Sequence, residues 1–258
     1  MSHALRPLPV LLHGQYFACE AGCGKTVPRV EQVEYSRTED HFDNVVESKT
    51  AAVWRSTCCS SNVLVYDRVT DDVVALDALP LKIYLAGFDV FRTDAAEYGD
   101  HLKSLCRQHR FEGMYPLDAE VDVTLPRAEQ AKWIYQRNIE RIRQCDVVMA
   151  NLADFRGTGE PDTGTAFEIG FAIASGKPVF AYMPDTRPLA ERMANMDSTT
   201  ATVCDKGFLI ENFGLPVNLM LACSATIVHG GPESCLDTIA VHFRLRRSSE
   251  GVTAQDAH

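Results

Sequence analysis

The sequence lacks any apolar run that approaches the roughly 20 residues needed to cross a bilayer. Residues 1–14 carry an apolar patch that is too short and too interrupted by proline for a secretory signal peptide. Positive charge is also scarce, because 25 Lys and Arg face 35 Asp and Glu for a net charge of −10. The one basic cluster, Arg244–Arg247, is short and suits a helix C-terminus. These absences predict a cytoplasmic protein that binds neither a membrane nor a nucleic-acid polymer.

The sequence also lacks the motifs of several common enzyme classes. It has no G-x-x-x-x-G-K-[ST] loop for a nucleoside triphosphate, no G-x-S-x-G nucleophile elbow and no H-E-x-x-H metal-binding helix. The Gly157-Thr-Gly159 segment lacks the third glycine of a dinucleotide fingerprint at the right spacing. No internal repeat or low-complexity segment is present.

What the sequence does contain, over residues 81–247, is a regular alternation of strand-like and helix-like segments. The expected strands are 82–87, 111–116, 146–152, 178–183 and 225–229, and the expected helices are 94–110, 127–144, 163–175 and 234–247. This rhythm predicts an α/β domain with a doubly wound, flavodoxin-like or Rossmann-like parallel sheet of about five strands. Right-handed crossovers would place helices on both faces of that sheet.

Residues 1–80 have a different character and predict a small β-rich module. Short strand-like segments occur at 15–19, 62–69 and 72–78, and no convincing amphipathic helix accompanies them. Asp77–Pro80 is a natural junction, because proline biases the residue before it away from helix. At the other end, residues 248–258 are polar and predict a flexible tail.

Nine cysteines, an odd number, favour free thiols or metal ligands over a disulfide scaffold. In the N-terminal module, Cys19, Cys23, Cys58 and Cys59 resemble a degenerate zinc knuckle, and a module with little core would gain folding energy from a structural zinc ion. Their spacing is irregular, since neither pair is a C-x-x-C, so free thiols remain the alternative. The other five have apolar neighbours and predict inert core thiols: Cys106, Cys145, Cys204, Cys223 and Cys235.

The most unusual local feature is a carboxylate inside an apolar helix. Between Asp162 and Lys177, Glu168 is the only formally charged residue, and its neighbours leave no broad polar face for it. Asp162 or Thr163 suits the helix N-cap, after a buried strand and a Gly- and Pro-rich loop. Such loops lie at the carboxyl ends of parallel strands, where open α/β folds bind ligands, so two carboxylates are expected to converge there. Paired carboxylates suit glycosyl chemistry.

Four separated segments resemble the nucleoside 2-deoxyribosyltransferase family, in the expected order over roughly residues 82–240. They are KIYLAG with Tyr84, CDVVMANL, DTGTAFEIG with Glu168, and LPVNLM with Asn218. The resemblance implies that Glu168 attacks C1′ of a 2′-deoxynucleoside, giving a covalent deoxyribosyl enzyme that a second base then attacks. It implies that Tyr84 orients Glu168 and that Asp162 exchanges a proton with the base.

The resemblance also implies the partners and the assembly. Asn218 would reach the sugar 5′-hydroxyl in a neighbouring subunit's site, so a homo-oligomer built from dimers is expected. The substrates would be 2′-deoxynucleosides and free nucleobases, with no organic cofactor and no catalytic metal.

Further substrate contacts follow from position in the resembling segments. Asn138 stands where some family members carry an aspartate, and its amide can hydrogen-bond but cannot supply a proton. Gly87, Phe88 and Asp89 resemble the loop over the sugar, and Asp118 is a further candidate sugar or base contact. By position alone, residues 155–157 are a candidate lid over the base.

Several alternatives stay open on sequence grounds. The same fold and nucleophile would serve a deoxynucleoside or deoxynucleotide N-glycosidase if water were the acceptor. A non-catalytic nucleoside-binding module is a third possibility, which the carboxylate in the apolar helix argues against. Glu168 would then be a paired structural carboxylate, Asp162 a plain helix cap, Tyr84 a core aromatic and Asn218 a turn residue.

Overall fold

The computed structural model describes residues 8–9, 11, 13–39, 45–76, 79–193, 203–204 and 206–243. The chain separates into two compact units, one reaching Pro80 and the other beginning at Leu81. The predicted tail 248–258, the basic cluster Arg244–Arg247 and part of the Asp77–Pro80 junction lie outside the described residues. Within those residues, no helix combines the length and the apolar character that a bilayer span requires.

The second unit is built on a five-stranded parallel sheet, which confirms the predicted α/β fold. The strands are β6 (Leu81–Ala86), β7 (Phe111–Met114), β8 (Val147–Asn151), β9 (Val179–Met183) and β10 (Thr226–His229). Their order across the sheet is β10-β9-β8-β6-β7, and every neighbouring pair is parallel. In this order the chain moves outward from β6 first to one side and then to the other, as in flavodoxin-like folds.

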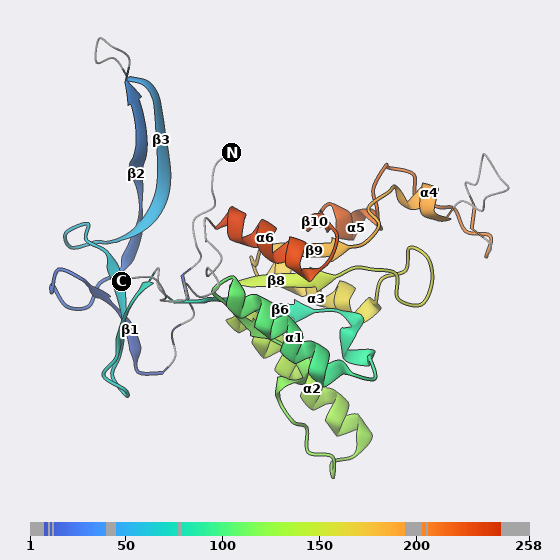
Figure 1. Cartoon of the computed structure of the whole chain (residues 1–258). Coiled ribbons are helices and arrows are strands. Elements are labelled where there is room, and N and C mark those ends of the chain that lie inside the picture. The colour runs from blue at the N-terminus through green and yellow to red at the C-terminus, as the bar shows by residue number, and fades with distance from the viewer. Residues whose placement is uncertain are drawn as a thin grey trace, which may run out of the picture. The chain divides into compact units, whose positions relative to one another are not determined.

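Helices cover both faces of this sheet (Figure 1). The main helices are α1 (Ala95–Gln108), α2 (Arg127–Gln144), α3 (Thr163–Ala174) and α6 (Pro232–His242), and two short ones are α4 (Leu189–Met193) and α5 (Leu219–Ala222). The α1 and α6 segments meet where Nε2 of His109 lies 3.1 Å from Oδ1 of Asp237. The α2 and α3 helices pack together on the opposite face.

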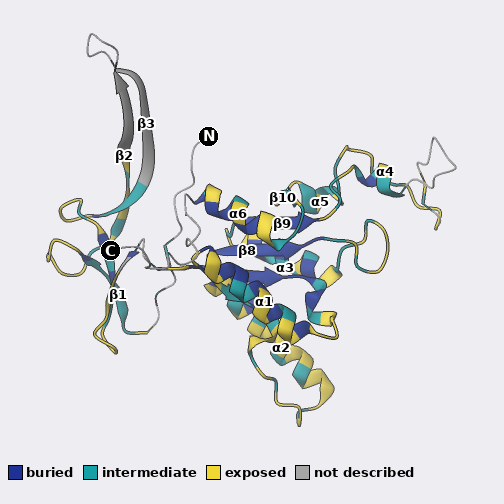
Figure 2. Cartoon of the chain, in the orientation of Figure 1, coloured by how far each residue is buried: buried dark blue, intermediate teal, exposed yellow. Residues whose placement is uncertain are grey.

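The core lies between the central strands and their helices (Figure 2). All five residues of β8 and all five of β9 are buried, because a parallel strand covered on both faces has no solvent side. Ile142 of α2 and Ile169 of α3 are fully buried against them. Three of the predicted core thiols, Cys106, Cys145 and Cys235, are buried, whereas Cys223 is exposed and the prediction for it was wrong.

The N-terminal unit is entirely β among its described elements. Its strands are β1 (Gln15–Cys19), β2 (Pro28–Glu39), β3 (Val45–Ser56), β4 (Val63–Asp67) and β5 (Val73–Ala75). The first, fourth and fifth form a three-stranded antiparallel sheet, and β2 pairs with β3 in a long hairpin. The core of this unit is small, with Val63, Val65 and Leu76 as its buried residues. The sequence predicted the β-rich character but not the hairpin, whose described side chains are mostly half-buried.

Candidate active site

Tyr84 and Glu168 come together from two elements that are far apart in the sequence. Tyr84 is a fully buried residue of β6, and Glu168 lies in the second turn of α3. The Tyr84 hydroxyl donates a hydrogen bond of 2.6 Å to Oε1 of Glu168. The contact is possible because β6 lies next to β8, and α3 follows β8 and packs on β6.

Asn138 is the third member of this cluster. It lies in α2, one turn before the buried Ile142, and its Nδ2 donates a hydrogen bond of 3.4 Å to the same Oε1 of Glu168. Its own Oδ1 is buried and has no hydrogen-bond partner among the described residues. Both donors therefore act on Oε1, while no described side chain donates to Oε2 of Glu168. The second carboxylate oxygen is the one available to a substrate.

The environment of Glu168 changes its acidity. Burial raises the pKa of the Glu168 carboxyl to about 7, and the negative charge of Asp162 acts in the same direction. The hydrogen bonds from Tyr84 and Asn138 oppose this rise, because they stabilise the carboxylate. Burial also raises the pKa of the Tyr84 hydroxyl well above its usual range, so the phenol stays protonated and remains a donor. The site thus holds a poorly solvated carboxyl group that is about half ionised at pH 7 and becomes fully ionised above it.

Asp162 caps the helix that carries Glu168. Its Oδ2 accepts hydrogen bonds from the Thr165 amide at 2.8 Å and from Thr165 Oγ1 at 3.0 Å. This is the N-cap geometry that the sequence predicted for Asp162 or Thr163, with Asp162 as the cap. Among the described residues no donor reaches Oδ1 of Asp162. Capping and contact with a substrate are therefore compatible at this residue, because they use different oxygens.

The loop after β6 places a buried carboxylate beside the end of β8. Asp89 lies in a 3₁₀ turn, Phe88–Phe91, and its Oδ2 accepts a hydrogen bond of 2.9 Å from Nδ2 of Asn151. Burial raises the pKa of Asp89. A Cβ atom at Gly87 would lie 2.9 Å from both Asn151 Cβ and Asp89 Oδ2, so only glycine allows this close approach.

An aromatic stack extends from the same turn. The ring of Phe155 stacks on Phe88 at 5.0 Å and on Phe91 at 5.4 Å between centroids. The Arg156 guanidinium lies 4.5 Å from the Phe155 centroid. The loop at 155–157 therefore packs on the loop that follows β6, which gives the lid hypothesis a physical contact.

Two of the predicted contact residues are engaged elsewhere. Both oxygens of Asp118 have partners, since Oδ2 accepts from the Tyr115 amide at 2.7 Å and Oδ1 from Lys103 at 2.6 Å. Asn218 is exposed and caps the short helix α5, with its Oδ1 accepting from the Met220 amide at 3.0 Å and its Nδ2 donating to Glu211. Neither hydrogen-bonds to the Glu168 cluster among the described residues.

Sequence reasoning missed a group of polar side chains around Asp89. Asn151 ends β8. Burial raises the pKa of the phenols of Tyr98, Tyr115 and Tyr182, and the Asp89 charge adds to each rise. The hydroxyl of Tyr115 is buried without a hydrogen-bond partner among the described residues. A signal for Asn151 was available, because it is the polar last residue of a buried strand at the sheet edge where ligands bind.

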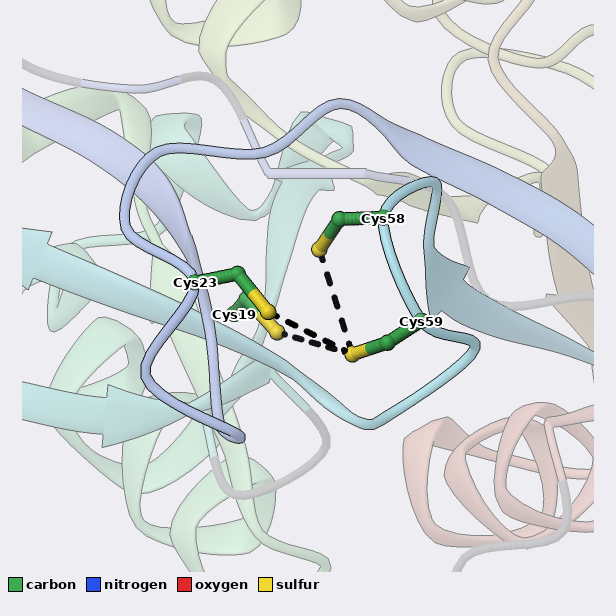
Figure 3. A group of neighbouring side chains, drawn as sticks. All are labelled: Cys19, Cys23, Cys58 and Cys59. Carbon is green, nitrogen blue, oxygen red and sulfur yellow. Dashed lines mark hydrogen bonds between the residues drawn. The ribbon is translucent and has the colours of Figure 1, made fainter.

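The four N-terminal cysteines do come together (Figure 3). The Sγ atoms of Cys19, Cys23, Cys58 and Cys59 all lie within 4.8 Å of one another, although the residues belong to two separate loops. Such a set of thiols can hold a metal ion. It belongs to the N-terminal unit and shares no residue with the Glu168 cluster.

Comparison with known proteins adds sequence relatives to this geometry. The chain is 34% identical to the 2-desoxiribosyltransferase from Leishmania mexicana, with a TM-score of 0.51, and the match covers 63% of this chain and 99% of that one. It is 34% identical over 113 residues to an uncharacterised protein of Schizosaccharomyces pombe, covering 43% of this chain and 54% of that protein. It is 31% identical over 108 residues to the 5-hydroxymethyl-dUMP N-hydrolase of Mus musculus, covering 40% of this chain and 57% of that protein.

The chain thus spans about half the length of the curated relatives that it matches. Residues 83–220, more than half of the chain and the part that contains Tyr84, Asn138, Asp162 and Glu168, match the family model described as nucleoside 2-deoxyribosyltransferase. The chain belongs to the nucleoside 2-deoxyribosyltransferase family.

Proposed function

We propose that this protein transfers 2-deoxyribose between the bases of 2′-deoxynucleosides through a covalent deoxyribosyl intermediate on Glu168. The observation that carries the proposal is the partly buried Glu168 carboxylate, held through Oε1 by Tyr84 and Asn138 with Oε2 left available. A carboxylate that has lost much of its hydration is a better nucleophile, and one fixed oxygen gives the other a defined direction of attack.

In the first half-reaction, Oε2 of Glu168 forms a bond to C1′ of the substrate as the C1′–N bond breaks. The electron pair of that bond goes to the departing base, which leaves well only when it is protonated. Asp162 is the proposed donor of this proton and must enter the step protonated, leaving it as a carboxylate; its Oδ1 has no donor among the described residues and is available for the transfer. The ribosyl carbon develops oxocarbenium character, which the nearby carboxylates stabilise.

In the second half-reaction, a ring nitrogen of another base attacks the same C1′. The C1′–O bond to Glu168 breaks, the carboxylate is regenerated, and Asp162 accepts the proton that the incoming base loses. Two inversions at one carbon give overall retention, with ping-pong kinetics. These two half-reactions change no oxidation state and need no cofactor, in keeping with the family.

The surrounding residues divide into sugar and base contacts. Asn138 presents a buried, unpartnered Oδ1 that suits a sugar hydroxyl, and Asp89 with Gly87 lines the loop after β6. Phe88, stacked on Phe155, offers an aromatic surface for the base. Asp118 is the weakest of the proposed contacts, since both of its oxygens already have partners.

The proposed assembly is a homo-oligomer in which Asn218 serves a neighbouring site. Asn218 is exposed and lies beside Met220, which is 70% exposed. The outer face of α3 is also apolar, since Phe167 is 52% and Ile173 is 40% exposed, and Tyr135 of α2 lies against Phe167. Exposed apolar side chains in such number favour contact with another subunit.

The second candidate function is hydrolysis, with water in place of the second base. It is favoured by the 31% identity to a deoxynucleotide N-hydrolase. Asn218, the residue proposed for the 5′ end of the substrate, is uncharged and suits a free 5′-hydroxyl better than a 5′-phosphate.

One experiment separates the two functions. Enzyme is incubated with deoxyinosine, with and without adenine, and the products are quantified by chromatography. Transfer predicts deoxyadenosine that forms only with adenine present. Hypoxanthine release at an equal rate in both samples, with no deoxyadenosine, contradicts it.

A second experiment tests the nucleophile. Intact mass spectrometry after mixing with a deoxynucleoside should detect a deoxyribosyl adduct that is absent in Glu168→Gln. Glu140→Gln, which removes an exposed carboxylate of α2, is the matched control and should retain the adduct.

A further inference from the structure

The four cysteines of the N-terminal unit are arranged around a common point rather than as pairs. The Sγ atom of Cys59 lies 3.4 Å from that of Cys19, 3.7 Å from that of Cys23 and 3.9 Å from that of Cys58 (Figure 3). In a tetrahedral site with Zn–S bonds of about 2.3 Å, the sulfur atoms lie about 3.8 Å apart. The three separations from Cys59 are close to this value, and all four Sγ atoms lie within 4.8 Å of one another, which is compatible with four ligands on one ion.

A disulfide explains this geometry less well. It joins two sulfurs at about 2.05 Å and leaves the other two outside. Here one sulfur, that of Cys59, has three sulfur neighbours at nearly equal distances. In a tetrahedral site every sulfur has the other three as neighbours at equal distances, and Cys59 approaches this arrangement.

Backbone geometry supports both ligand loops. Between β1 and β2, the Cys19 amide donates to the Gly24 carbonyl at 2.9 Å and the Gly22 amide donates to the Cys19 carbonyl at 3.0 Å. Gly22 and Gly24 have φ of 80° and 89°, where glycine is favoured, so the chain can turn sharply around Cys23. These tight turns bring Cys19 and Cys23 to the same side although three residues separate them.

The second loop, between β3 and β4, has a comparable turn. The Ser60 amide donates to the Ser56 carbonyl at 3.1 Å, and Ser60 has φ of 56°. At this turn the side chains of both Cys58 and Cys59 reach the cluster, although the two residues are adjacent in the chain. The two loops are also joined directly, since the Thr57 amide donates to the Val27 carbonyl at 3.2 Å.

Hydroxyl groups surround the sulfurs and would support thiolates. Ser61 Oγ lies 3.0 Å from Cys19 Sγ, and Ser56 Oγ lies 3.6 Å from Cys19 Sγ and 3.7 Å from Cys59 Sγ. Thr26 Oγ1 lies 3.8 Å from Cys58 Sγ. Hydrogen bonds of this kind around a metal orient its ligands.

We propose that Cys19, Cys23, Cys58 and Cys59 bind one structural Zn²⁺ as thiolates. The ion would join the turn before β2 to the turn after β3 and so fix the base of the β2–β3 hairpin. The unit needs such a link, because its buried core is limited to Val63, Val65 and Leu76 with a few partly buried residues around them. Binding releases the thiol protons, so the site is expected to weaken at acidic pH.

The first test is the metal content of the full chain, purified under reducing conditions without added metal and measured by mass spectrometry of the elements. The expected result is one zinc per chain. Iron in its place, or no metal together with thiols that remain free, overturns the assignment.

The second test locates the ion and excludes disulfides. Cys58→Ser and Cys23→Ser should each lower bound zinc severalfold, whereas Cys223→Ser, which removes an exposed thiol of the other unit, should leave it unchanged. Intact mass without reductant should show no loss of hydrogen. A mass lower by two hydrogens per disulfide, or zinc retained in both variants, contradicts the proposal.

The third test asks what the ion stabilises. Treating the zinc-loaded chain with a chelator should increase protease cleavage within residues 13–76, while deoxyribosyl transfer by the other unit is measured in parallel. Cleavage unchanged after zinc removal overturns the structural role. Transfer activity is a separate readout, so failure of the proposed function leaves this test intact.

Discussion

The Tyr84 hydroxyl lies 2.6 Å from Oε1 of Glu168 and donates a hydrogen bond to it. This contact has two effects on the carboxylate. It occupies one oxygen and leaves the other to the substrate, and it opposes the rise in pKa that burial imposes on Glu168. Position and charge of the proposed nucleophile therefore depend on the same phenol, and the two effects can be tested separately.

The pH dependence of transfer tests the charge effect. Glu168 must be ionised to attack, and burial raises its pKa to about 7, so kcat/KM should fall as pH decreases through about 7. Tyr84→Phe removes a hydrogen bond that lowers this pKa, so the acidic limb should move to higher pH. The loss of a hydrogen bond to a charged group, about 1.5–3 kcal/mol, should also lower the rate about 10- to 100-fold.

Tyr66→Phe is the control for this substitution. It removes a phenol of the N-terminal unit that donates a hydrogen bond to the carboxylate of Asp71. It should leave the pH profile unchanged. An acidic limb at the same pH in Tyr84→Phe and in the unaltered protein would argue against a role for Tyr84 in setting the Glu168 charge.

Ionised Glu168 is needed for activity but should lower the free energy of unfolding. The pKa of Glu168 is about 7 in the folded protein and 4.5 for a solvent-exposed glutamate, so the folded state binds more protons between these values and loses stability as pH rises through them. Glu168→Gln carries no charge and should be more stable than the unaltered protein at pH 8, by about 3 kcal/mol, with the difference vanishing below pH 4.5.

Denaturant unfolding at pH 4 and pH 8 measures this difference. Glu140→Gln, at an exposed ion pair with Arg137, should change stability by less than about 1 kcal/mol at either pH. Equal stability of Glu168→Gln and the unaltered protein at pH 8 would contradict the costly burial of this carboxylate.

Asp162 allows capping and proton exchange to be distinguished. Asp162→Asn keeps a side-chain oxygen for the Thr165 amide and should leave the melting temperature nearly unchanged, but it cannot exchange a proton and should slow transfer at least 100-fold. Asp162→Ala should lose about 1 kcal/mol of stability in addition. Transfer by Asp162→Asn at the normal rate would reduce Asp162 to a helix cap.

The shared site is tested by mixing inactive variants. Asn218→Ala and Glu168→Gln should each be nearly inactive alone. If Asn218 completes a neighbour's site, subunit exchange between them creates mixed dimers with one intact site, restoring about a quarter of full activity by random assortment. Mixtures that stay as inactive as their components place Asn218 outside the neighbouring site.

The periodic parts of the fold could be predicted from sequence. The predicted helix 127–144 coincides with α2, and the strand predicted at 146–152 contains β8, because amphipathic and buried β-branched patterns report burial directly. The β2–β3 hairpin was missed for the complementary reason. Its described side chains are mostly half-buried and Ser56 is the buried one among them, so its sequence shows no clear alternating apolar face; backbone pairing joins the two strands.

By itself, the sequence determined the alternation of strands and helices that predicts an α/β fold, the apolar α3 with its lone carboxylate, and the Asp162 cap, since each depends on residues near one another in the chain. Only the tertiary structure decided that Tyr84 and Asn138 share one oxygen of Glu168, that Asn151 holds Asp89, and that four irregularly spaced cysteines meet. These contacts join segments 30 to 84 residues apart, and local periodicity carries no record of which strands become neighbours.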